Sequence, residues 1–136
     1  MAFLWIILIL VVGLLAYIRL APHDVTRWHH SASDAQIGET QLDGGYIWRQ
    51  DAGADGSAKL AKLDQVVRAT PRTVPLAGSV QDGQITYITR SQVIGFPDYT
   101  TVTLKEGVLE IYGRLRFGKS DLGVNAKRIK GWRAQL

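Results

Sequence analysis

The sequence contains no cysteine, and this absence excludes several classes of protein at once. Disulfide scaffolds, thiolate zinc sites, iron–sulfur centres and cysteine nucleophiles all require a thiol. The chain is also too rich in hydrophobic residues, at 46%, and too poor in charged residues, at 21%, to be disordered or collagen-like. Its 136 residues leave room for one folded domain of ordinary size.

Charge is missing altogether from residues 2–18, which are strongly apolar. As a helix extended to about residue 21, this run is long enough to cross the hydrocarbon core of a bilayer. Trp5 lies near one end of the run, and Tyr17 and Arg19 lie near the other; all three are residue types that settle at membrane interfaces. The pattern therefore predicts a single transmembrane helix over residues 1–21, with these three side chains as interfacial anchors.

The alternative for this segment is a cleaved signal peptide. No Lys or Arg precedes the apolar core, and the small-residue candidates for a cleavage site, around Ala16 and Ala21, have Leu14 or Arg19 two positions earlier. Neither feature fits the usual signal-peptide pattern, so we expect an uncleaved anchor. Since Arg19 and Arg27 follow the span, the positive-inside rule taken alone places the domain in the cytoplasm.

Residues 22–42 form a polar stretch that predicts an irregular juxtamembrane linker, with Trp28 as an interfacial anchor or a cover over the domain. The stretch also holds side chains that a metal site could use: His23, Asp24, His29, His30 and Asp34. The histidines lack the i, i+4 pairing of helical zinc sites, and an irregular segment would not preorganise them. We therefore predict no metal site here.

Residues 43–136 are predicted to form one α+β domain. Because the connections between its predicted strands are short, they favour an antiparallel meander sheet, with the helices on one face. Turn signals and periodicity indicate a strand at 46–48, a helix from Ser57 as its cap to about Ala69, strands over 72–80, 84–91, 99–105 and 108–117, and a terminal helix from about Asn125.

The strand over 108–117 shows the cleanest period-two alternation in the chain. Its apolar face is expected to be buried and its polar face to point outward. The predicted outward residues are Glu110, Tyr112, Arg114 and Arg116.

The segment from Gly113 to Ser120 reads GRLRFGKS and matches the phosphate-loop pattern G-x-x-x-x-G-K-[ST]. A phosphate loop lies between a buried parallel strand and a helix, whereas Gly113 falls inside an alternating strand and bulky residues follow it. We therefore predict no nucleotide binding. No nucleophile with a base and no acid pair stands out, so neither an enzyme nor a cofactor site is predicted.

Basic charge is concentrated towards the carboxyl terminus. Residues 105–136 hold eight basic and three acidic side chains, net +5, whereas residues 22–104 hold seven and nine, net −2. The basic region is either a solvated surface or one that faces lipid headgroups or an acidic partner. Nucleic acid is not the expected partner, because exposed aromatic residues do not alternate with the cations. The candidate anion- or partner-binding residues are Arg90, Arg114, Arg116, Lys119, Ser120 and Arg128.

Three segments, TYITRS at 86–91, GFPDYTTV at 95–102 and RLRFGKSDLGVNAKRI at 114–129, together resemble the domain of unknown function family 1499 (DUF1499). The resemblance covers about residues 40–134. Members of that family are small bacterial envelope and plastid proteins, often behind a signal or membrane segment, with no established reaction. The resemblance therefore implies export, and we favour the periplasm or its equivalent for the domain over the cytoplasm.

The resemblance also singles out three motif residues, Asp98, Asp121 and Asn125. The family pattern has a second acid directly after the first of these, but Tyr99 stands there in this chain, which argues against a paired-carboxylate or metal mechanism. We expect Asp98 to pair with an arginine in a structural role. Asp121 and Asn125 are expected to hold the turn and cap the terminal helix.

The leading hypothesis is a single-pass membrane protein whose small domain binds a larger integral membrane complex as an accessory or assembly subunit. The alternative is a binder of an anionic small molecule or lipid headgroup, in a pocket lined by Arg90, Arg114, Arg116 and Lys119. We expect residues 114–128 to be the working surface, where four donors converge on one anion: Arg114, Arg116, Lys119 and Ser120.

Overall fold

The computed structural model describes residues 1–32 and 35–136, so Asp34, named above as a possible metal ligand, lies outside the described residues. The elements in chain order are α1 (Ala2–Leu20), α2 (Val25–Trp28), β1 (Gly38–Leu42), β2 (Gly45–Asp51), a 3-10 turn (Gly53–Asp55), α3 (Gly56–Arg68), β3 (Thr73–Ser79), β4 (Gln84–Arg90), β5 (Pro97–Lys105), β6 (Val108–Leu115) and α4 (Val124–Arg133). The predicted α+β class is confirmed.

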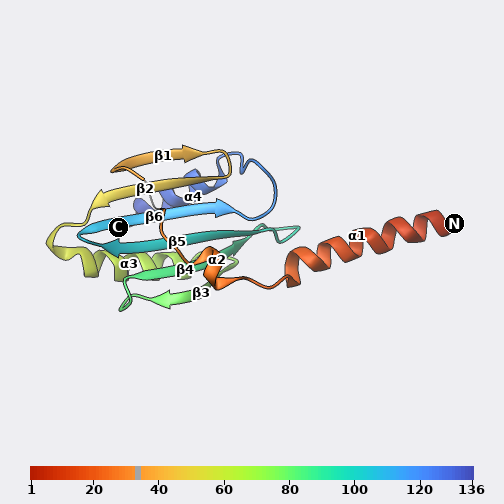
Figure 1. Ribbon diagram of the computed structural model, residues 1–136, viewed down its shortest axis with the longest axis horizontal. Coiled ribbons are helices and arrows are strands. Elements are labelled where there is room, and N and C mark those ends of the chain that lie inside the picture. The colour runs from red at the N-terminus through yellow and green to blue at the C-terminus, as the bar shows by residue number, and fades with distance from the viewer. Residues whose placement is uncertain (33–34) are drawn as a thin grey trace.

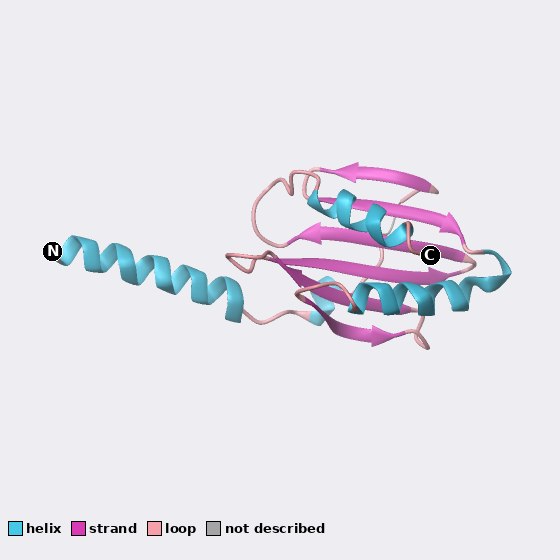
Figure 2. Cartoon of the chain, turned by 180° about the vertical axis from the view of Figure 1, so that it is seen from behind, coloured by secondary structure: helices cyan, strands magenta, loops and turns pink. Residues whose placement is uncertain are grey.

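The six strands form one antiparallel sheet in the order β1-β2-β6-β5-β4-β3. Strands β3 to β6 follow one another as the predicted meander, and β6 then pairs with β2, so the last strand lies inside the sheet. Helices α3 and α4 cover one face, and α1 extends away from one end of the sheet (Figure 1, Figure 2).

The main core lies between the sheet and helices α3 and α4. From α3, the helical spacing of Leu60, Leu63 and Val67 places three fully buried side chains against the sheet. Helix α4 contributes Ile129 and Trp132 in the same way. The strands supply the opposing surface of this core with Tyr46, Trp48, Ile85, Tyr87, Val102, Leu109 and Ile111.

The predicted start of the first domain helix at a Ser57 cap is wrong by two residues. Helix α3 begins at Gly56, and its N-cap is Asp55, which makes no side-chain capping bond. A Cβ on Gly56 would lie 3.1 Å from Leu104 Cδ1, so the helix starts at a position that packs closely on a side chain of β5.

The prediction of an irregular linker over residues 22–42 is wrong in two places. Residues 38–42 form β1, which pairs with β2 at the edge of the sheet. Residues 25–28 form the single turn α2, capped by the Asp24 carboxylate. This turn places Trp28 in a stacked arrangement on Tyr99, with the ring centroids 4.0 Å apart.

The side chain of Trp28 is consequently buried, at 8% exposure. The assignment of this residue as an interfacial membrane anchor is wrong, and the alternative, a cover over the domain, is confirmed. With Ile88 and Tyr99 it forms a second, smaller apolar cluster on the face of the sheet opposite α3 and α4.

Replacement of Gly113 tests how closely α4 packs on β6. A Cβ at this position would lie 2.6 Å from Asn125 Oδ1 and 3.2 Å from Ile129 Cδ1. We expect Gly113→Ala to lower the free energy of unfolding by ~1–3 kcal/mol, because an added methyl group overpacks a close-packed interior. Urea unfolding of the full chain in detergent, followed by tryptophan fluorescence, measures this change.

The matched control is Gly131→Ala, also in α4, where no atom lies within 4 Å of the added Cβ. This variant should raise the free energy of unfolding by ~0.5–1 kcal/mol, since alanine favours a helix interior over glycine. Equal stability of Gly113→Ala and the wild type would contradict the close packing described.

Candidate functional site

The carboxyl-terminal end of α1 is joined directly to the folded domain. Ile18 and Ala21 are 4% and 5% exposed, unlike the rest of the helix. The Arg90 guanidinium donates to the carbonyl oxygens of Ile18 (3.3 Å), Arg19 (3.1 Å) and Gly95 (2.9 Å). The last carbonyls of a helix lack partners within it, so Arg90 supplies donors where α1 needs them.

A second arginine, Arg116, holds the next part of the chain. Its Nη1 donates to the Pro22 carbonyl oxygen at 3.0 Å and to the Tyr99 hydroxyl at 3.1 Å. Arg114, two residues earlier on β6, donates to Thr101 Oγ1 at 2.8 Å and to the carbonyl oxygen of Trp28. We call this set, Arg90, Arg114 and Arg116 with the backbone of residues 18–28, the arginine junction.

The expectation that Arg114 points to solvent is therefore wrong. This residue is 6% exposed, because the segment before β1 lies over the face that the alternation predicts as polar. Burial lowers the pKa of the Arg114 guanidinium to about 10, which leaves it charged at neutral pH. Glu110, on the same face, is 3% exposed, and burial raises the pKa of its carboxyl group.

His23 lies in the middle of the arginine junction. Its Nε2 is 3.2 Å from Arg90 Nη2, which is always a donor, so this nitrogen accepts the bond. Its Nδ1 is 2.5 Å from the Tyr99 hydroxyl and donates to it in this tautomer. Burial, followed by the positive charges of Arg90 and Arg116, lowers the pKa of the His23 imidazole.

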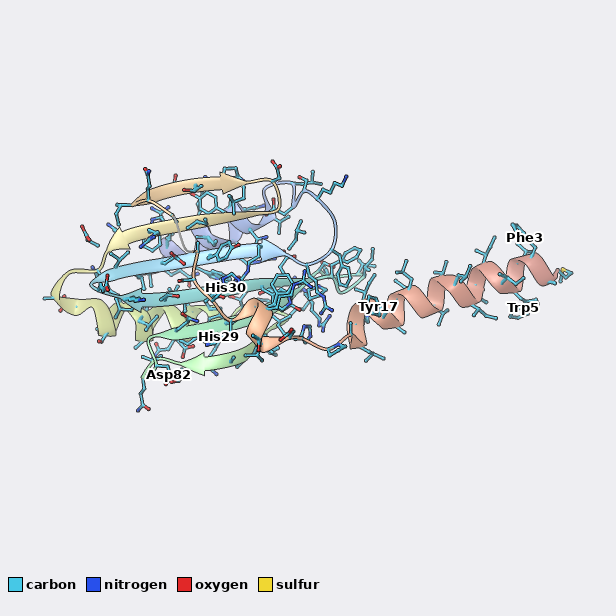
Figure 3. All side chains as sticks on the ribbon, viewed as in Figure 1. Phe3, Trp5, Tyr17, His29, His30 and Asp82 are labelled. Carbon is cyan, nitrogen blue, oxygen red and sulfur yellow. The ribbon has the colours of Figure 1, made fainter. Side chains whose placement is uncertain are left out.

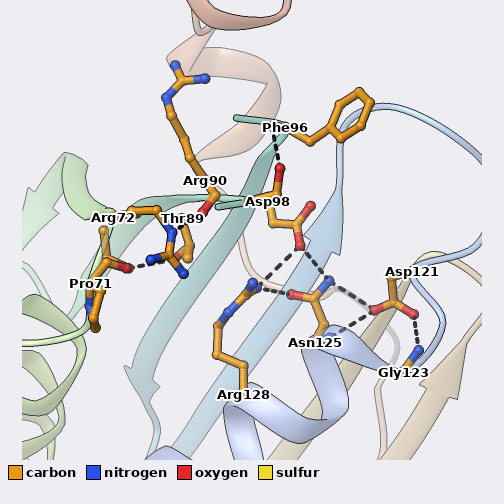
Figure 4. A network of polar contacts seen from close by, with 12 residues as sticks. Pro71, Arg72, Thr89, Arg90, Phe96, Asp98, Asp121, Gly123, Asn125 and Arg128 are labelled. Carbon is orange, nitrogen blue, oxygen red and sulfur yellow. Dashed lines mark hydrogen bonds and ion pairs between the residues drawn. The ribbon is translucent and has the colours of Figure 1, made fainter. Parts of the chain in front are cut away.

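The motif residues form a separate network on the other face, at the start of α4 (Figure 4). Asp98 Oδ2 accepts bonds from Arg128 Nη1 and Asn125 Nδ2, both at 3.3 Å. Asn125 Nδ2 also donates to Asp121 Oδ2 at 3.0 Å, and its Oδ1 accepts from Arg128 at 3.1 Å. Asp98 thus pairs with an arginine and joins β5 to α4.

The pKa values in this network shift in opposite directions. Burial raises the pKa of Asp98 in spite of the neighbouring Arg128 charge. Burial also acts to raise the pKa of Asp121, but the hydrogen bonds it accepts, from the Asn125 side chain and from backbone amides, outweigh burial and lower it. Its Oδ1 accepts from the Gly123 amide at 3.0 Å and its Oδ2 from the Asn125 amide at 3.1 Å.

Asp121 therefore holds the turn before α4 in the way that the sequence indicates. The expected capping role of Asn125 is wrong, because the N-cap of α4 is Gly123 and Asn125 lies in the first turn. Its side chain is fully buried and links Asp98, Asp121 and Arg128 instead.

The predicted convergence of four donors on one anion is not observed. Arg114 and Arg116 bind the backbone of residues 22–28, whereas Lys119 and Ser120 are exposed in the loop before α4. Ser120 instead helps to line a groove of about 610 Å³ between this loop and the 91–96 loop. Its lining includes Arg90, Phe96, Asp98, Leu115, Phe117, Asp121, Leu122 and Arg128.

The three histidines do not gather into a metal site. His29 Nδ1 lies 2.7 Å from Thr86 Oγ1, and His30 Nδ1 lies 2.9 Å from the Ser31 carbonyl oxygen, so each binds a different partner from His23. Among residues 1–32 and 35–136, no group of three His, Asp or Glu side chains is placed to hold a metal ion.

The phosphate-loop match has the structural context that the sequence analysis predicts. Gly113 lies within β6, opposite Thr100 of β5 and Tyr46 of β2. The Leu115 amide donates to the Gly44 carbonyl oxygen at 2.8 Å, so the first backbone amides of the match serve the sheet.

Two side chains that contact the arginines of the junction, those of His23 and Tyr99, are not among the predicted site residues. His23 was considered only as a metal ligand, and Tyr99 only as the replacement of an acid. The alternation of β5 would place Tyr99 on the same face as Thr101, but nothing local indicates that Trp28 covers this face.

The model of the family described as protein of unknown function (DUF1499) matches residues 26–136. The chain belongs to this family, as its motifs indicate. The match begins at residue 26, so it includes most of α2 and the start of β1, which lie before the segment covered by the resemblance. No curated protein matches the chain.

Acidification is expected to destabilise the arginine junction. Since folding lowers the pKa of His23, the unfolded chain takes up a proton first as the pH falls. The stabilising contribution of neutral His23 is complete above the unfolded value of ~6.5 and is lost as the pH falls through the lower folded value. Urea midpoints of the full chain in detergent, measured from neutral to mildly acidic pH, should decrease accordingly.

The variant His23→Gln should remove this part of the pH dependence, and His30→Gln, at an exposed position, should keep it. Asp98 and Glu110, whose pKa values are raised, contribute the opposite slope, and the comparison between variants cancels their effect. An unchanged pH dependence in His23→Gln would show that this residue does not sense pH.

Proposed function

We propose that this member of the DUF1499 family is a single-pass membrane protein, and that its domain is an accessory or assembly subunit of a larger integral membrane complex. Helix α1 is long and apolar enough to cross a membrane, and nearly all of it is exposed. Trp5 and Tyr17 lie near its two ends (Figure 3), where interfacial anchors are expected.

The contacts at the end of α1 support an uncleaved anchor over a signal peptide. Cleavage after Ala21 would remove Ile18 and Arg19, whose carbonyl oxygens bind Arg90. Cleavage after Ala16 would leave about one helical turn, too short to remain helical by itself. A domain that uses the end of α1 in its own packing is better suited to retaining it.

The arginine junction is the observation that carries the proposed role. It fixes the backbone of residues 18–28 on the sheet, so the domain does not hang from a flexible linker but has a set position relative to α1. A partner embedded in the same bilayer would meet a preoriented domain, and preorganisation lowers the entropy cost of binding. This arrangement fits a subunit that binds beside a membrane protein.

The same contacts weaken the alternative, an anion-binding pocket. Three of its four predicted cations, Arg90, Arg114 and Arg116, already donate to the chain's own backbone. Arg128 at the groove is paired with Asp98. A binding role is also favoured over a catalytic one. Within residues 1–32 and 35–136 the grouped polar side chains bind one another or the backbone, and the hydroxyl beside His29, that of Thr86, is fully buried.

The proposed function is tested by crosslinking the tagged full chain in native membranes and isolating it in mild detergent. We expect integral membrane proteins to co-isolate with the wild type. The double variant Arg90→Ala and Arg116→Ala should reduce their recovery severalfold, because it releases the domain from its fixed position on α1.

The matched control is Arg68→Ala, which removes an exposed arginine of α3 that pairs with Asp64 of the same helix. Recovery with this variant should equal that of the wild type. Enrichment of no membrane protein would contradict the proposed role, and a retained anion seen by native mass spectrometry would favour the alternative.

We further propose that the domain lies on the exported side of the membrane, which the family resemblance implies. An alkaline phosphatase fused to the carboxyl terminus should then be active, and a reporter that fluoresces only in the cytoplasm should stay dark. The reverse pattern would show that Arg19 and Arg27 determine the orientation.

A further inference from the structure

Two loops at the α1 end of the sheet expose large apolar side chains. One joins β4 to β5 (residues 91–96), and the other joins β6 to α4 (residues 116–123); both lie at the end from which α1 extends (Figure 1). Val93 is 82% exposed and Leu122 is 91% exposed. Ile94 and Phe96 add further exposed apolar surface in the first loop.

The first loop is built to hold this surface in place. Ser91 Oγ accepts the backbone amides of Gly95 (3.1 Å) and Phe96 (2.9 Å), which closes the loop on itself. Val93 and Ile94 are left at its tip. In water such a tip exposes apolar surface without compensation, so it is suited to a less polar medium.

Contacts with the last turn of α1 hold both loops at the level of that turn along the helix axis. Arg19 donates to the carbonyl oxygens of Val93 (2.8 Å) and Ile94 (3.1 Å). The Tyr17 ring meets the Phe117 ring edge-on, with centroids 6.0 Å apart. If α1 spans the bilayer, its last turn lies at the headgroup region, and the two loops must lie there too.

Exposed cations lie at both loops. Arg19, at the end of α1, contacts the first loop, and Lys119 belongs to the second. One exposed acid, Asp43, lies beside the second loop, where its carbonyl oxygen accepts the Asp121 amide at 3.2 Å. The two acids that line the groove, Asp98 and Asp121, are engaged with Arg128, Asn125 and backbone amides. An anionic lipid surface attracts each nearby cation by ~1 kcal/mol, while apolar tips insert between the headgroups.

We infer that loops 91–96 and 116–123 form a membrane-contact surface that binds an anionic bilayer, with Val93 and Leu122 inserted and Lys119 facing the phosphates. This inference rests on the proposed anchoring by α1. The domain would then contact the membrane itself, because the two loops would hold the sheet against the bilayer in addition to the anchoring by α1. The occupant is the bilayer in which α1 already sits, so the surface is continuous with the anchor.

The chain has no native cysteine, so a spin label attaches only at a cysteine that is introduced for the test. The full chain is reconstituted in phosphatidylcholine nanodiscs with and without phosphatidylglycerol. Labels are placed by Val93→Cys and Leu122→Cys. Leu10→Cys, inside α1, reports insertion of the anchor, and Asp82→Cys, in the turn at the far end of β4, is the matched water-exposed control.

We expect labels at 93 and 122 to be relaxed by oxygen and protected severalfold from a water-soluble nickel complex, and the label at 82 to show the reverse. Protection should be greater when phosphatidylglycerol is present. Lys119→Ala should lower the protected population about fivefold, the effect of one cation at an anionic surface. The control Lys105→Ala, at the opposite end of β5, should leave it unchanged.

The label at 10 separates the two proposals. If it is protected from nickel while the labels at 93 and 122 are freely accessible, the membrane-contact surface is wrong and the anchor stands. If the label at 10 is also accessible, the anchoring fails, and the inference with it. Protection of 93 and 122 in native membranes but not in nanodiscs would assign the loops to a protein partner and overturn the inference.

Discussion

Arginine donors bound to backbone carbonyl oxygens are the interaction on which the rest of this structure depends. A carbonyl oxygen at a helix end or outside regular secondary structure must find a donor or water, and those of Ile18, Arg19, Pro22 and Trp28 find Arg90, Arg114 and Arg116. An arginine carries five N–H groups in a fixed plane, so one side chain satisfies several carbonyls at once. The chain before the sheet is thereby held along the sheet's second face.

This covering segment changes the chemistry of the face beneath it. Trp28 stacks on Tyr99, and Glu110 accepts the Ala32 amide at 2.8 Å while its other oxygen lies 3.5 Å from Arg49. Polar side chains of a sheet surface become buried groups that need partners, since an unpaired buried charge would be costly. Both faces of the sheet are thus covered, one by the apolar faces of α3 and α4 and the other by a polar, arginine-bonded segment.

The parts of the fold that could be predicted from sequence are those with local signals. Strand β6 and helix α3 each show a period that their own residues fix, and turn signals bound β4 and β5. The four predicted ranges agree with the observed ones within a few residues. Strand β1 reads GETQL, with no alternation of apolar residues, and α2 has a single turn, so neither shows a period. Of the candidate site, the sequence indicates the pairing of Asp98 with an arginine and the turn held by Asp121, but not the network that joins them through Asn125.

The net charge of the carboxyl-terminal residues did not predict which arginines are free to bind an anion, and the reason is physical. The net charge of +5 over residues 105–136 suggests an anion-binding surface. However, Arg114 and Arg116 donate to carbonyl oxygens of the chain itself, and Arg128 pairs with Asp98. An arginine on a half-buried strand can donate to a carbonyl oxygen of the same chain just as it can to the phosphate of a ligand. The covering segment between α1 and β1 decides between the two, because its carbonyl oxygens lie beside these arginines. The arginines therefore bind the segment that joins α1 to the sheet, and their donors fix the position of the domain relative to α1.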